Sequence, residues 1–274
     1  MMNLRVPRKL VLQGRLADTV LLTYRTPAAS VEALLPEGLE LVRRGPWAFW
    51  SVVCCRVEQL RPSGVPAALG VGFHQVAYRL RVQAMTASAE VIDGLYFTHS
   101  DVDTPLPALF DALGNRLTDL RLHRAAIRMQ GGDDAVQVAI DPATSEAGYR
   151  FRLDVAHTPA SRLPGSCFPT VEDARSFGRY PPRALSVHPV KGGPANHELH
   201  VMRVGRPDSS WCETPVAVRE AALGYFEAIG QGEKAALEWA ARLRPMSYQW
   251  SLGERHTLLN RADVARRWSG VASA

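Results

Sequence analysis

The feature that most restricts the fold of this chain is a strict alternation of residue types between residues 73 and 82. Successive side chains of a β-strand point to opposite faces, so an alternation with a period of two predicts a strand. One face of this strand is apolar apart from His74 and Tyr78. The other face carries three side chains that could contact a polar ligand, namely Gln75, Arg79 and Arg81.

Two kinds of sheet produce such an alternation. In the first, one side of the sheet faces water, which is the usual origin of the pattern. In the second, the sheet closes into a barrel whose interior is polar because it holds a ligand. Both arrangements place the polar side chains together on one face, so the periodicity alone does not distinguish them.

Similar patterns along the chain predict a mainly β protein with short peripheral helices. Strands are expected at 16–24, 47–57, 73–82, 91–99, 135–140, 148–155, 184–190, 198–204 and 246–252. Short helices are expected after Thr26, after Thr104, and at 214–226, 233–243 and 260–268. Because the strands follow one another without regular helices between them, they are expected to pair in antiparallel fashion.

Length and composition indicate one soluble domain, residues 1–274, with its core at roughly 16–252. Hydrophobic residues make up 46% and charged residues 22%, as in ordinary globular proteins. No run approaches the ~18 apolar residues of a membrane span, and no long apolar segment follows the basic N-terminus. We therefore expect a cytoplasmic protein that binds no membrane.

The charge and the cysteines exclude several classes of partner and cofactor. The net charge is +5, but the basic residues are scattered and do not form the stripe of a nucleic-acid-binding protein. Cys54 and Cys55 are adjacent, which suits neither a disulfide framework nor a zinc site. We expect reduced cysteines, no metal and no other cofactor. The oligomeric state stays open, and a homo-oligomer is one alternative.

Lysine is rare in this chain. Only three of the 32 basic residues are lysine, namely Lys9, Lys191 and Lys234. Arginine stays protonated at neutral pH and does not attack a carbonyl carbon as an amine. Chemistry through a Schiff base therefore has three candidate residues.

Histidines near the central strand are candidates for acid–base chemistry, namely His74, His99 and His123. A single histidine is more often packed and hydrogen-bonded than catalytic. Asp101 and Asp103 are expected to make hydrogen bonds in a turn and at a helix start. His197 and His200 are three residues apart and would face opposite sides of a strand, so metal binding is not expected there.

Several short sequence motifs along the chain, each occurring once, match those of a known family. They are Leu35-Pro36-Glu37-Gly38, the alternation at 73–81, Gly94-Leu95-Tyr96-Phe97, Leu122-His123-Arg124-Ala125 and Tyr248-Gln249-Trp250. Together they resemble the YqjF-like family of uncharacterised bacterial proteins (domain of unknown function 2071), in the acetoacetate-decarboxylase-like superfamily. The resemblance spans roughly residues 16–252.

The resemblance implies a single antiparallel, cone-shaped β-barrel with a ligand-sized interior, and it favours the polar-interior alternative. Decarboxylases of this superfamily form a Schiff base between a lysine and a β-keto acid. The matching positions here are Leu122-His123 or His123-Arg124, and the assisting glutamate falls on Gln75. Lysine-dependent decarboxylation is therefore not expected.

Three functions remain open. The first is binding of a small anionic organic molecule, a keto or carboxylic acid, with its carboxylate at Arg79 or Arg81. The second is a lyase- or isomerase-like enzyme acting on a β-keto or enolisable acid, with a histidine as acid or base and an arginine as anchor. The third is a structural or protein-interaction module whose contact face is either the cluster of Trp47, Phe49 and Trp50 or the C-terminal helices. Other candidate site residues are Gln75, Tyr78, His99, Trp250 and, as the catalytic candidate, His123.

Overall fold

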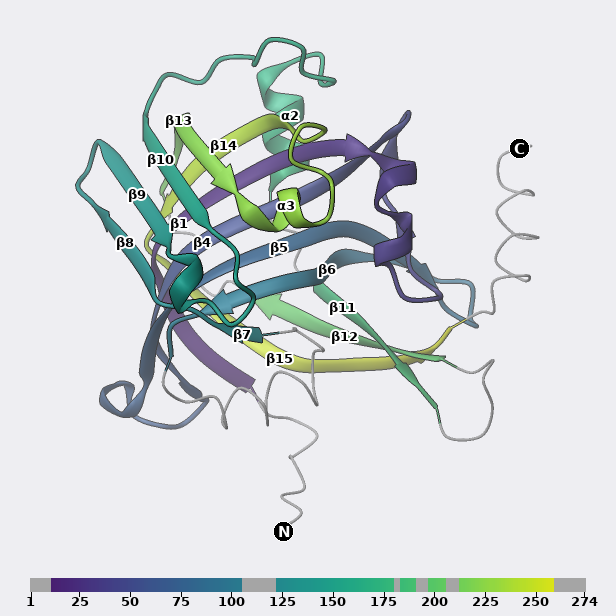
Figure 1. Ribbon diagram of the computed structural model, residues 1–274. Coiled ribbons are helices and arrows are strands. Elements are labelled where there is room, and N and C mark those ends of the chain that lie inside the picture. Colours follow the sequence, from purple (N-terminus) through teal and green to yellow (C-terminus); the bar gives the residue numbers. More distant parts are fainter. Residues whose placement is uncertain (1–10, 105–121, 180–182, 191–196, 206–211, 259–274) are drawn as a thin grey trace.

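The computed structural model describes residues 11–104, 122–179, 183–190, 197–205 and 212–258. Its strands form one 15-stranded sheet (Figure 1). The strands are β1 (Val11–Pro27), β2 (Glu40–Leu41), β3 (Arg43–Arg44), β4 (Trp47–Pro62), β5 (Val71–Met85), β6 (Val91–Val102), β7 (Leu122–Arg124), β8 (Ile127–Gly131), β9 (Ala135–Ile140), β10 (Phe151–His157), β11 (Arg183–Pro189), β12 (His197–Gly205), β13 (Cys212–Leu223), β14 (Ala236–Arg244) and β15 (Met246–Thr257).

Helices are short and peripheral. The α-helices of the described residues are α2 (Val171–Gly178) and α3 (Gly224–Ala228). Single turns of 3-10 helix occur at Ala28–Ser30, Glu32–Leu34, Ala67–Leu69 and Pro142–Thr144. Neither α2 nor α3 is long and apolar enough to cross a membrane.

Seven strands close into a ring. In hydrogen-bonding order they are β4, β5, β6, β11, β12, β15 and β1, and β1 pairs again with β4. Every pairing is antiparallel except the short parallel contact between β6 and β11. The sheet therefore closes, as the barrel alternative required, and the chain has the mainly β fold that the strand patterns predicted. The polar, ligand-holding interior of that alternative does not follow from the closure, because most side chains inside the ring are apolar. This contact, and the parallel pairing of β6 with β7 outside the ring, depart from the all-antiparallel expectation.

A glycine lies at the parallel contact between β6 and β11. Among the described residues, the backbone register pair there is Leu95 with Ala184. A Cβ on Gly94 would lie 2.8 Å from the Leu185 side chain and 3.0 Å from the Arg183 carbonyl oxygen. Real Cβ atoms essentially never lie within 3.0 Å of another heavy atom, so a larger residue at this position would require Leu185 to shift and the β11 backbone to adjust slightly.

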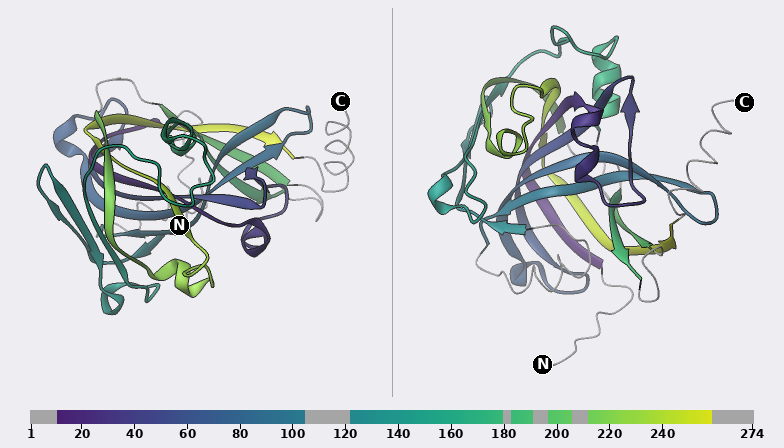
Figure 2. Two further views of the ribbon diagram at one scale, coloured as in Figure 1. Left: turned by 90° about the horizontal axis from the view of Figure 1, so that it is seen from above. Right: turned by 45° about the vertical axis from the view of Figure 1, so that its right-hand side comes forward.

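The remaining large strands are attached to the ring through β1 and form a branch of the sheet, made of β14, β13, β10, β9 and β8. Residues 11–16 of β1 pair with β15, whereas residues 19–25 pair with β14. From β14 the sheet continues through β13, β10, β9 and β8, which lie on the opposite side of the molecule from the β11–β12 hairpin (Figures 1 and 2). One core lies between this branch and the ring, and it includes Leu22, Trp50, Tyr78, Val138 and Leu153. A second core, including Leu21, Val53 and Ala77, fills the ring itself.

These two cores bury both faces of β5. Val76, Tyr78 and Leu80 belong to the core under the branch, and Phe73 and Ala77 belong to the core inside the ring. The alternation of β5 is thus real, but its polar face is not solvated. Cys54 and Cys55 likewise point into different cores, as expected for neighbours in a strand.

The predicted helices at 214–226 and 233–243 are wrong: these segments are β13 with the short α3, and β14. In β13, Val216 and Val218 precede a bulge and Ala221 and Leu223 follow it, so a broken alternation imitates helical spacing. In β14 both faces are buried, which gives a nearly continuous apolar run.

Other expectations about helices have mixed outcomes. The segment after Thr26 forms two 3-10 turns and no α-helix, and α2 was not predicted. The helices expected after Thr104 and at 260–268 lie outside the described residues. The chain is therefore richer in strands than its sequence pattern indicated.

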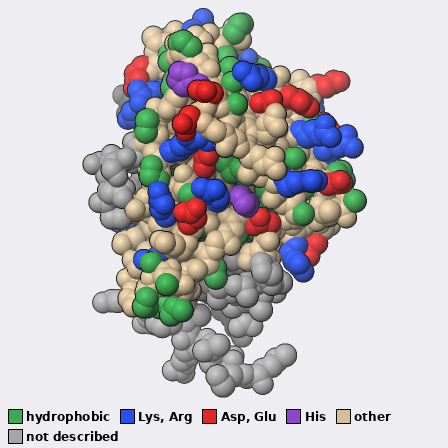
Figure 3. All heavy atoms as spheres, turned by 90° about the vertical axis from the view of Figure 1, so that its left-hand side faces the viewer, with side chains coloured by type: hydrophobic (Ala, Val, Ile, Leu, Met, Phe, Trp, Pro, Cys, Tyr) green, Lys and Arg blue, Asp and Glu red, His purple; other side chains and the backbone are tan. Residues whose placement is uncertain are grey.

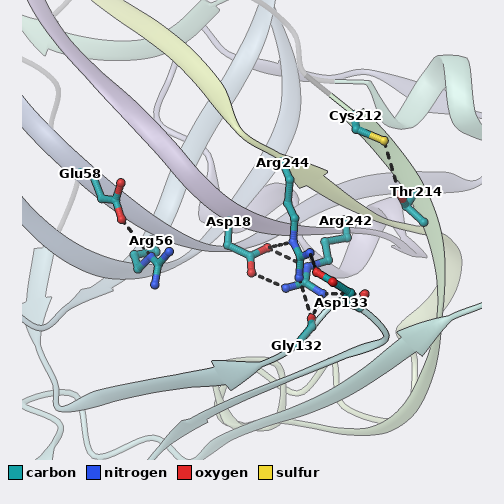
Figure 4. Close-up of polar contacts among 9 residues, drawn as sticks. All are labelled: Asp18, Arg56, Glu58, Gly132, Asp133, Cys212, Thr214, Arg242 and Arg244. Atoms are coloured by element: carbon teal, nitrogen blue, oxygen red, sulfur yellow. Dashed lines mark hydrogen bonds and ion pairs between the residues drawn. The ribbon is translucent and has the colours of Figure 1, made fainter. Parts of the chain in front are cut away.

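Two arginines of β14 tie the branch to β1 (Figure 4). Arg242, which is 5% exposed, contacts both carboxylate oxygens of Asp18 and donates to the Gly132 carbonyl oxygen at 2.6 Å. Arg244 donates to the same carbonyl at 2.7 Å and pairs with Asp133 at 2.8 Å. The turn between β8 and β9 is therefore held against the strand that joins ring and branch.

We expect Arg242→Ala to lower the free energy of unfolding by about 2 kcal/mol. Losing one partner of a buried ion pair costs ~3–5 kcal/mol, and this pair is partly screened by solvent. Urea unfolding followed by circular dichroism measures the change. Arg203→Ala is the control, because the Arg203–Glu254 pair is about half exposed on both sides, and it should change stability by less than ~0.5 kcal/mol. Equal losses in the two variants would contradict the role of Arg242.

Charged side chains elsewhere are mixed in sign. On the face shown in Figure 3, Lys and Arg alternate with Asp and Glu rather than forming a stripe. That distribution does not resemble the basic tracks of proteins that follow a phosphate backbone.

Candidate functional site

The ring encloses a small cavity. Its volume is about 40 Å³, room for roughly three water molecules. Most of its lining is apolar. The lining residues are Leu16, Val53, Cys55, Val57, Phe73, Gln75, Arg79, Leu95, Phe97, Arg183, Ala184, Met202, Val204, Met246, Tyr248 and Trp250. An apolar pocket with a few polar groups is typical of a small-molecule site.

Arg79 is the charged group buried deepest in this lining. It is 1% exposed, its Nε donates to the Ser51 carbonyl oxygen at 3.2 Å, and its Nη2 donates to Ser51 Oγ at 2.8 Å. Its guanidinium carbon lies 5.6 Å from the centre of the Phe97 ring. Neighbouring strands thus hold a cation in place inside the ring.

Further polar side chains share this face of the sheet. Thr23 pairs with Ser51, Thr19 with Cys55, and Ser100 with Ala77 in the strand register. The hydroxyl oxygens of Thr19, Thr23 and Ser100 are buried and have no hydrogen-bond partner among the residues that the structure describes. Buried polar atoms are normally paired with protein or ordered water, and these three hydroxyls lie on the cavity's face of the sheet but outside the cavity lining.

The pKa of the Cys55 thiol is affected both by its burial beside the cavity and by the nearby positive charge. Burial raises the pKa of Cys55 to about 12, and the positive charge of Arg79 opposes part of that increase. The thiol is therefore protonated at neutral pH and contributes an uncharged wall. Arg79 provides positive charge without a reactive thiolate beside it.

Arg81 faces the same way but lies at the end of the ring under α2. Its Nη1 donates to the Phe177 carbonyl oxygen, and its guanidinium stacks 4.1 Å from the centre of the Phe177 ring. Burial lowers the pKa of Arg81, and the Asp93 carboxylate partly restores it. Arg183, also in the lining, forms a half-exposed pair with Asp93 at 3.2 Å. Arg79 is thus the better placed of the two predicted arginines for a ligand in the cavity.

The predicted site residues fall into two groups on opposite faces of β5 and β6. Gln75, Arg79 and Trp250 line the cavity. Tyr78, His99 and His123 lie under the branch instead, where the Tyr78 and His99 rings are 6.1 Å apart and the His99 and His123 rings 4.6 Å apart. The structure does not bring an arginine of β5 to these histidines, so one site combining both, as the second hypothesis required, does not form around β5.

Sequence analysis missed residues in both groups. Ser51 positions Arg79, and Asp101 accepts from or shares a proton with His99 at 3.0 Å. Asp101 was assigned to a turn because the strand was expected to end at residue 99, whereas β6 runs to Val102. His99 and Asp101 are two apart in a strand and so share a face, a signal that the correct strand length would have revealed.

The remaining candidates for chemistry are not assembled into a site in the described part of the chain. No three His, Cys, Asp or Glu side chains there are grouped to hold a metal ion. Lys234 is exposed in the turn before β14, and Lys9 and Lys191 lie outside the described residues. Trp47 and Phe49 pack against α2 while Trp50 packs under the branch, so this cluster is core.

Solved structures with the same architecture are acetoacetate-decarboxylase-like proteins. An acetoacetate decarboxylase-like enzyme from Sphingomonas wittichii RW1 superposes with a TM-score of 0.56 at 16% identity, covering 93% of this chain and 94% of that one. Acetoacetate decarboxylase from Legionella pneumophila subsp. pneumophila str. Philadelphia 1 gives 0.56 at 12% identity, covering 95% and 94%. The enduracididine biosynthesis enzyme MppR, complexed with pyruvate, gives 0.55 at 14% identity, covering 94% and 93%.

Identities this low establish the acetoacetate-decarboxylase-like fold and nothing about chemistry. None of the curated proteins matches the sequence. The model of the DUF2071 family, described as "Uncharacterized conserved protein", matches residues 13–171. That match covers more than half of the chain and includes β1, β4, β5 and β6, which carry Arg79 and its neighbours. The chain therefore belongs to the DUF2071 family, and its fold is that of the acetoacetate-decarboxylase-like proteins.

Proposed function

We propose that the protein binds a small organic monoacid inside the ring, with the carboxylate at Arg79. The observation that carries this proposal is a guanidinium, 1% exposed, in the lining of an otherwise mostly apolar cavity. A guanidinium matches the geometry of a carboxylate and can bind both of its oxygens. An apolar environment strengthens that interaction relative to water.

The size of the cavity limits the ligand. A volume of about 40 Å³ suits an acid with a short chain rather than a drug-sized molecule. Val53, Val57 and Met246 would contact the apolar part of the ligand, and Gln75 would hydrogen-bond to a second polar group. Pyruvate, found in complex with MppR, is a monoacid of this size held by a protein of the same fold.

The proposal excludes a covalent step through lysine. Lys234 is exposed and does not belong to the described cavity lining, which contains no lysine. An arginine holds the acid by charge and hydrogen bonds and leaves its carbonyl carbon unattacked. Borohydride treatment in the presence of pyruvate should leave the protein mass unchanged, and a covalent adduct on any lysine would contradict the proposal.

A carboxylate titration tests the site. Acetate, propionate, butyrate and pyruvate are titrated into the full chain by calorimetry, with thermal unfolding in parallel. A ligand that binds only the folded state adds about 1.4 kcal/mol of stability at ten times its Kd. Arg79→Met should raise Kd by roughly 10- to 100-fold, because hydrogen bonds to charged groups contribute ~1.5–3 kcal/mol.

Two further variants separate binding from folding. Ser51→Ala removes the hydroxyl that holds Arg79 Nη2 and should weaken binding severalfold while the chain stays folded. Arg203→Met, an exposed arginine outside the ring lining, should leave Kd unchanged. Absence of binding by all four acids to the folded protein, or equal Kd values for Arg79→Met and the parent chain, would overturn the proposal.

A further inference from the structure

A second group of ionisable side chains lies on the opposite face of β5 and β6 from Arg79. His99 is its centre and is 3% exposed. Its ring is stacked between two others: the His123 ring at 4.6 Å and 21°, and the Tyr225 ring at 4.8 Å and 12°. The Tyr149 ring meets it edge-on at 5.3 Å. Packing on both faces and one edge therefore holds the imidazole in one orientation.

Asp101 completes this group, which we call the His99 cluster (Tyr78, His99, Asp101, His123, Tyr149 and Tyr225). The His99 Nε2 and Asp101 Oδ2 atoms are 3.0 Å apart, and both side chains are 4% exposed. A histidine that donates its Nε2 proton to a carboxylate keeps the lone pair of Nδ1 as an acceptor. An imidazole oriented by a carboxylate is the arrangement in which histidine serves as a general base.

Packing alone does not account for Asp101. Its second oxygen, Oδ1, is buried and has no hydrogen-bond partner within the described residues. A carboxyl group in an apolar core is costly, and an alanine or asparagine would have avoided the ionisable oxygen. Its register partner on β5 is the apolar Val76, which offers no side-chain donor. A buried carboxylate kept at this cost is typical of a functional site.

The tyrosines of the cluster supply uncharged donors. Burial raises the pKa of Tyr78 well above its ordinary value, and the nearby Cys54 and Asp101 add to the increase. Tyr78 therefore keeps its phenolic proton at neutral pH. Its ring lies 4.9 Å from that of Tyr225, which in turn lies 5.8 Å from that of Tyr149. The cluster thus combines one oriented base with phenol groups that can hydrogen-bond a developing oxyanion.

The two sides of the cluster differ in exposure. His123 and Tyr149 are half-buried, whereas Tyr78 and Tyr225 are 1% and 7% exposed. His123 comes from the short strand β7, which pairs in parallel with the end of β6 next to Asp101. A small molecule would therefore approach between His123 and Tyr149, with Tyr78 and Tyr225 closing the inner side.

We propose that His99 is the general base of a proton-transfer site for small ketones and oxo acids, with Asp101 as its positioning residue. His99 Nδ1 takes a proton from the carbon next to the carbonyl group. The electron pair of that C–H bond forms the C=C bond of an enolate, and the carbonyl oxygen takes the negative charge. Return of a proton to carbon restores the ketone, so the cycle needs no oxidant and no second substrate. This site shares no residue with the carboxylate site at Arg79 and stands independently of it.

Hydrogen exchange with solvent detects this step directly. The full chain is incubated in D₂O with acetone, pyruvate or 2-oxobutyrate, and loss of the proton signal next to the carbonyl is followed by NMR. Exchange should exceed the buffer rate for at least one compound. His99→Gln should slow it by about 100-fold, within the range of general acid–base catalysis. Asp101→Asn should lower kcat and leave KM unchanged, because a positioning residue does not contact the substrate.

The controls keep the outcomes distinct. His74, which pairs with Asp103 at 2.7 Å on the partly exposed end of β5, gives the matched variant His74→Gln, and exchange should be unchanged there. If His99→Gln does not fold, His123→Gln is measured in its place, because His123 is half-buried and its ring covers one face of His99. A severalfold loss of exchange in this variant supports the proposal. Exchange at the buffer rate for all three compounds, or an unchanged rate in the folded variants of the cluster, would overturn it. The acid titration at Arg79 can succeed or fail separately.

Discussion

Gly253→Ala should prevent the ring from closing and cost about 3 kcal/mol or more of unfolding free energy, if the variant folds at all. Gly253 lies in β15 opposite a bulge, where the register with β12 shifts between Val201 and Arg203. A Cβ at this position would lie 1.2 Å from the Val201 carbonyl oxygen and 2.4 Å from its carbonyl carbon. Because these are backbone atoms of the paired strand, no side chain can rotate away to make room.

Gly205→Ala provides the matched control on the same pair of strands. The nearest atoms to a Cβ on Gly205 belong to Gln249 and lie 3.8 Å away, an ordinary contact. This substitution should change stability by less than about 1 kcal/mol. Urea unfolding of both variants makes the comparison. A Gly253→Ala chain as stable as Gly205→Ala would show that β12 and β15 do not pair as described. Because this pairing is one link of the ring, the closed ring would then be contradicted as well.

Trp50→Ala should lower the free energy of unfolding by about 3–5 kcal/mol, the usual cost of removing a fully buried aromatic side chain. Trp50 is 1% exposed and lies between the ring and the branch. Its ring meets Phe226 edge-on at 5.0 Å and Tyr225 at 6.3 Å. Its Nε1 donates to Thr26 Oγ1 at 3.0 Å, so the substitution also leaves a buried hydroxyl without this donor.

Trp47→Ala is the comparison for this prediction. Trp47 is half-buried, lies on the other face of β4 and stacks under Arg25 at 4.8 Å. Its removal should cost about 1 kcal/mol, because it buries less surface and its cation–π contact contributes ~0.5–1 kcal/mol. Urea denaturation measures the free energy of unfolding of both variants, and the two curves are fitted with the same dependence of that free energy on urea concentration. Similar losses for the two tryptophans would mean that the core under the branch is not packed around Trp50 as described.

Much of the fold follows from local pattern. The alternation at 73–82 predicted both the strand and the separation of Arg79 from Tyr78, because a period of two sends adjacent side chains to opposite faces. The antiparallel pairing expected of consecutive strands is confirmed for β9 with β10 and for β11 with β12. Turn residues between apolar segments mark such neighbours without any knowledge of distant contacts.

The C-terminal segments show where local pattern fails. Residues 236–244 carry apolar side chains on nearly every position because β14 contributes to several cores: Ala240 to the one under the branch, Leu243 to the one in the ring, and Trp239 to the cluster beneath α2. An apolar run of this kind fits either a buried strand or a helix, and only the partner strands decide between them.

By itself, the sequence determined the candidate chemistry: an arginine and a glutamine on one face of the central strand, histidines near its neighbour, and no lysine at the position that the resemblance implies. The tertiary structure decided which of these side chains meet. It buried both faces of β5, and so placed Arg79 in the ring cavity and His99 against Asp101 and Tyr225 under the branch. The reason is physical: ring closure and the fold-back of the branch depend on pairing between residues more than 200 positions apart, such as Leu12 with Trp250, and no local periodicity encodes such contacts.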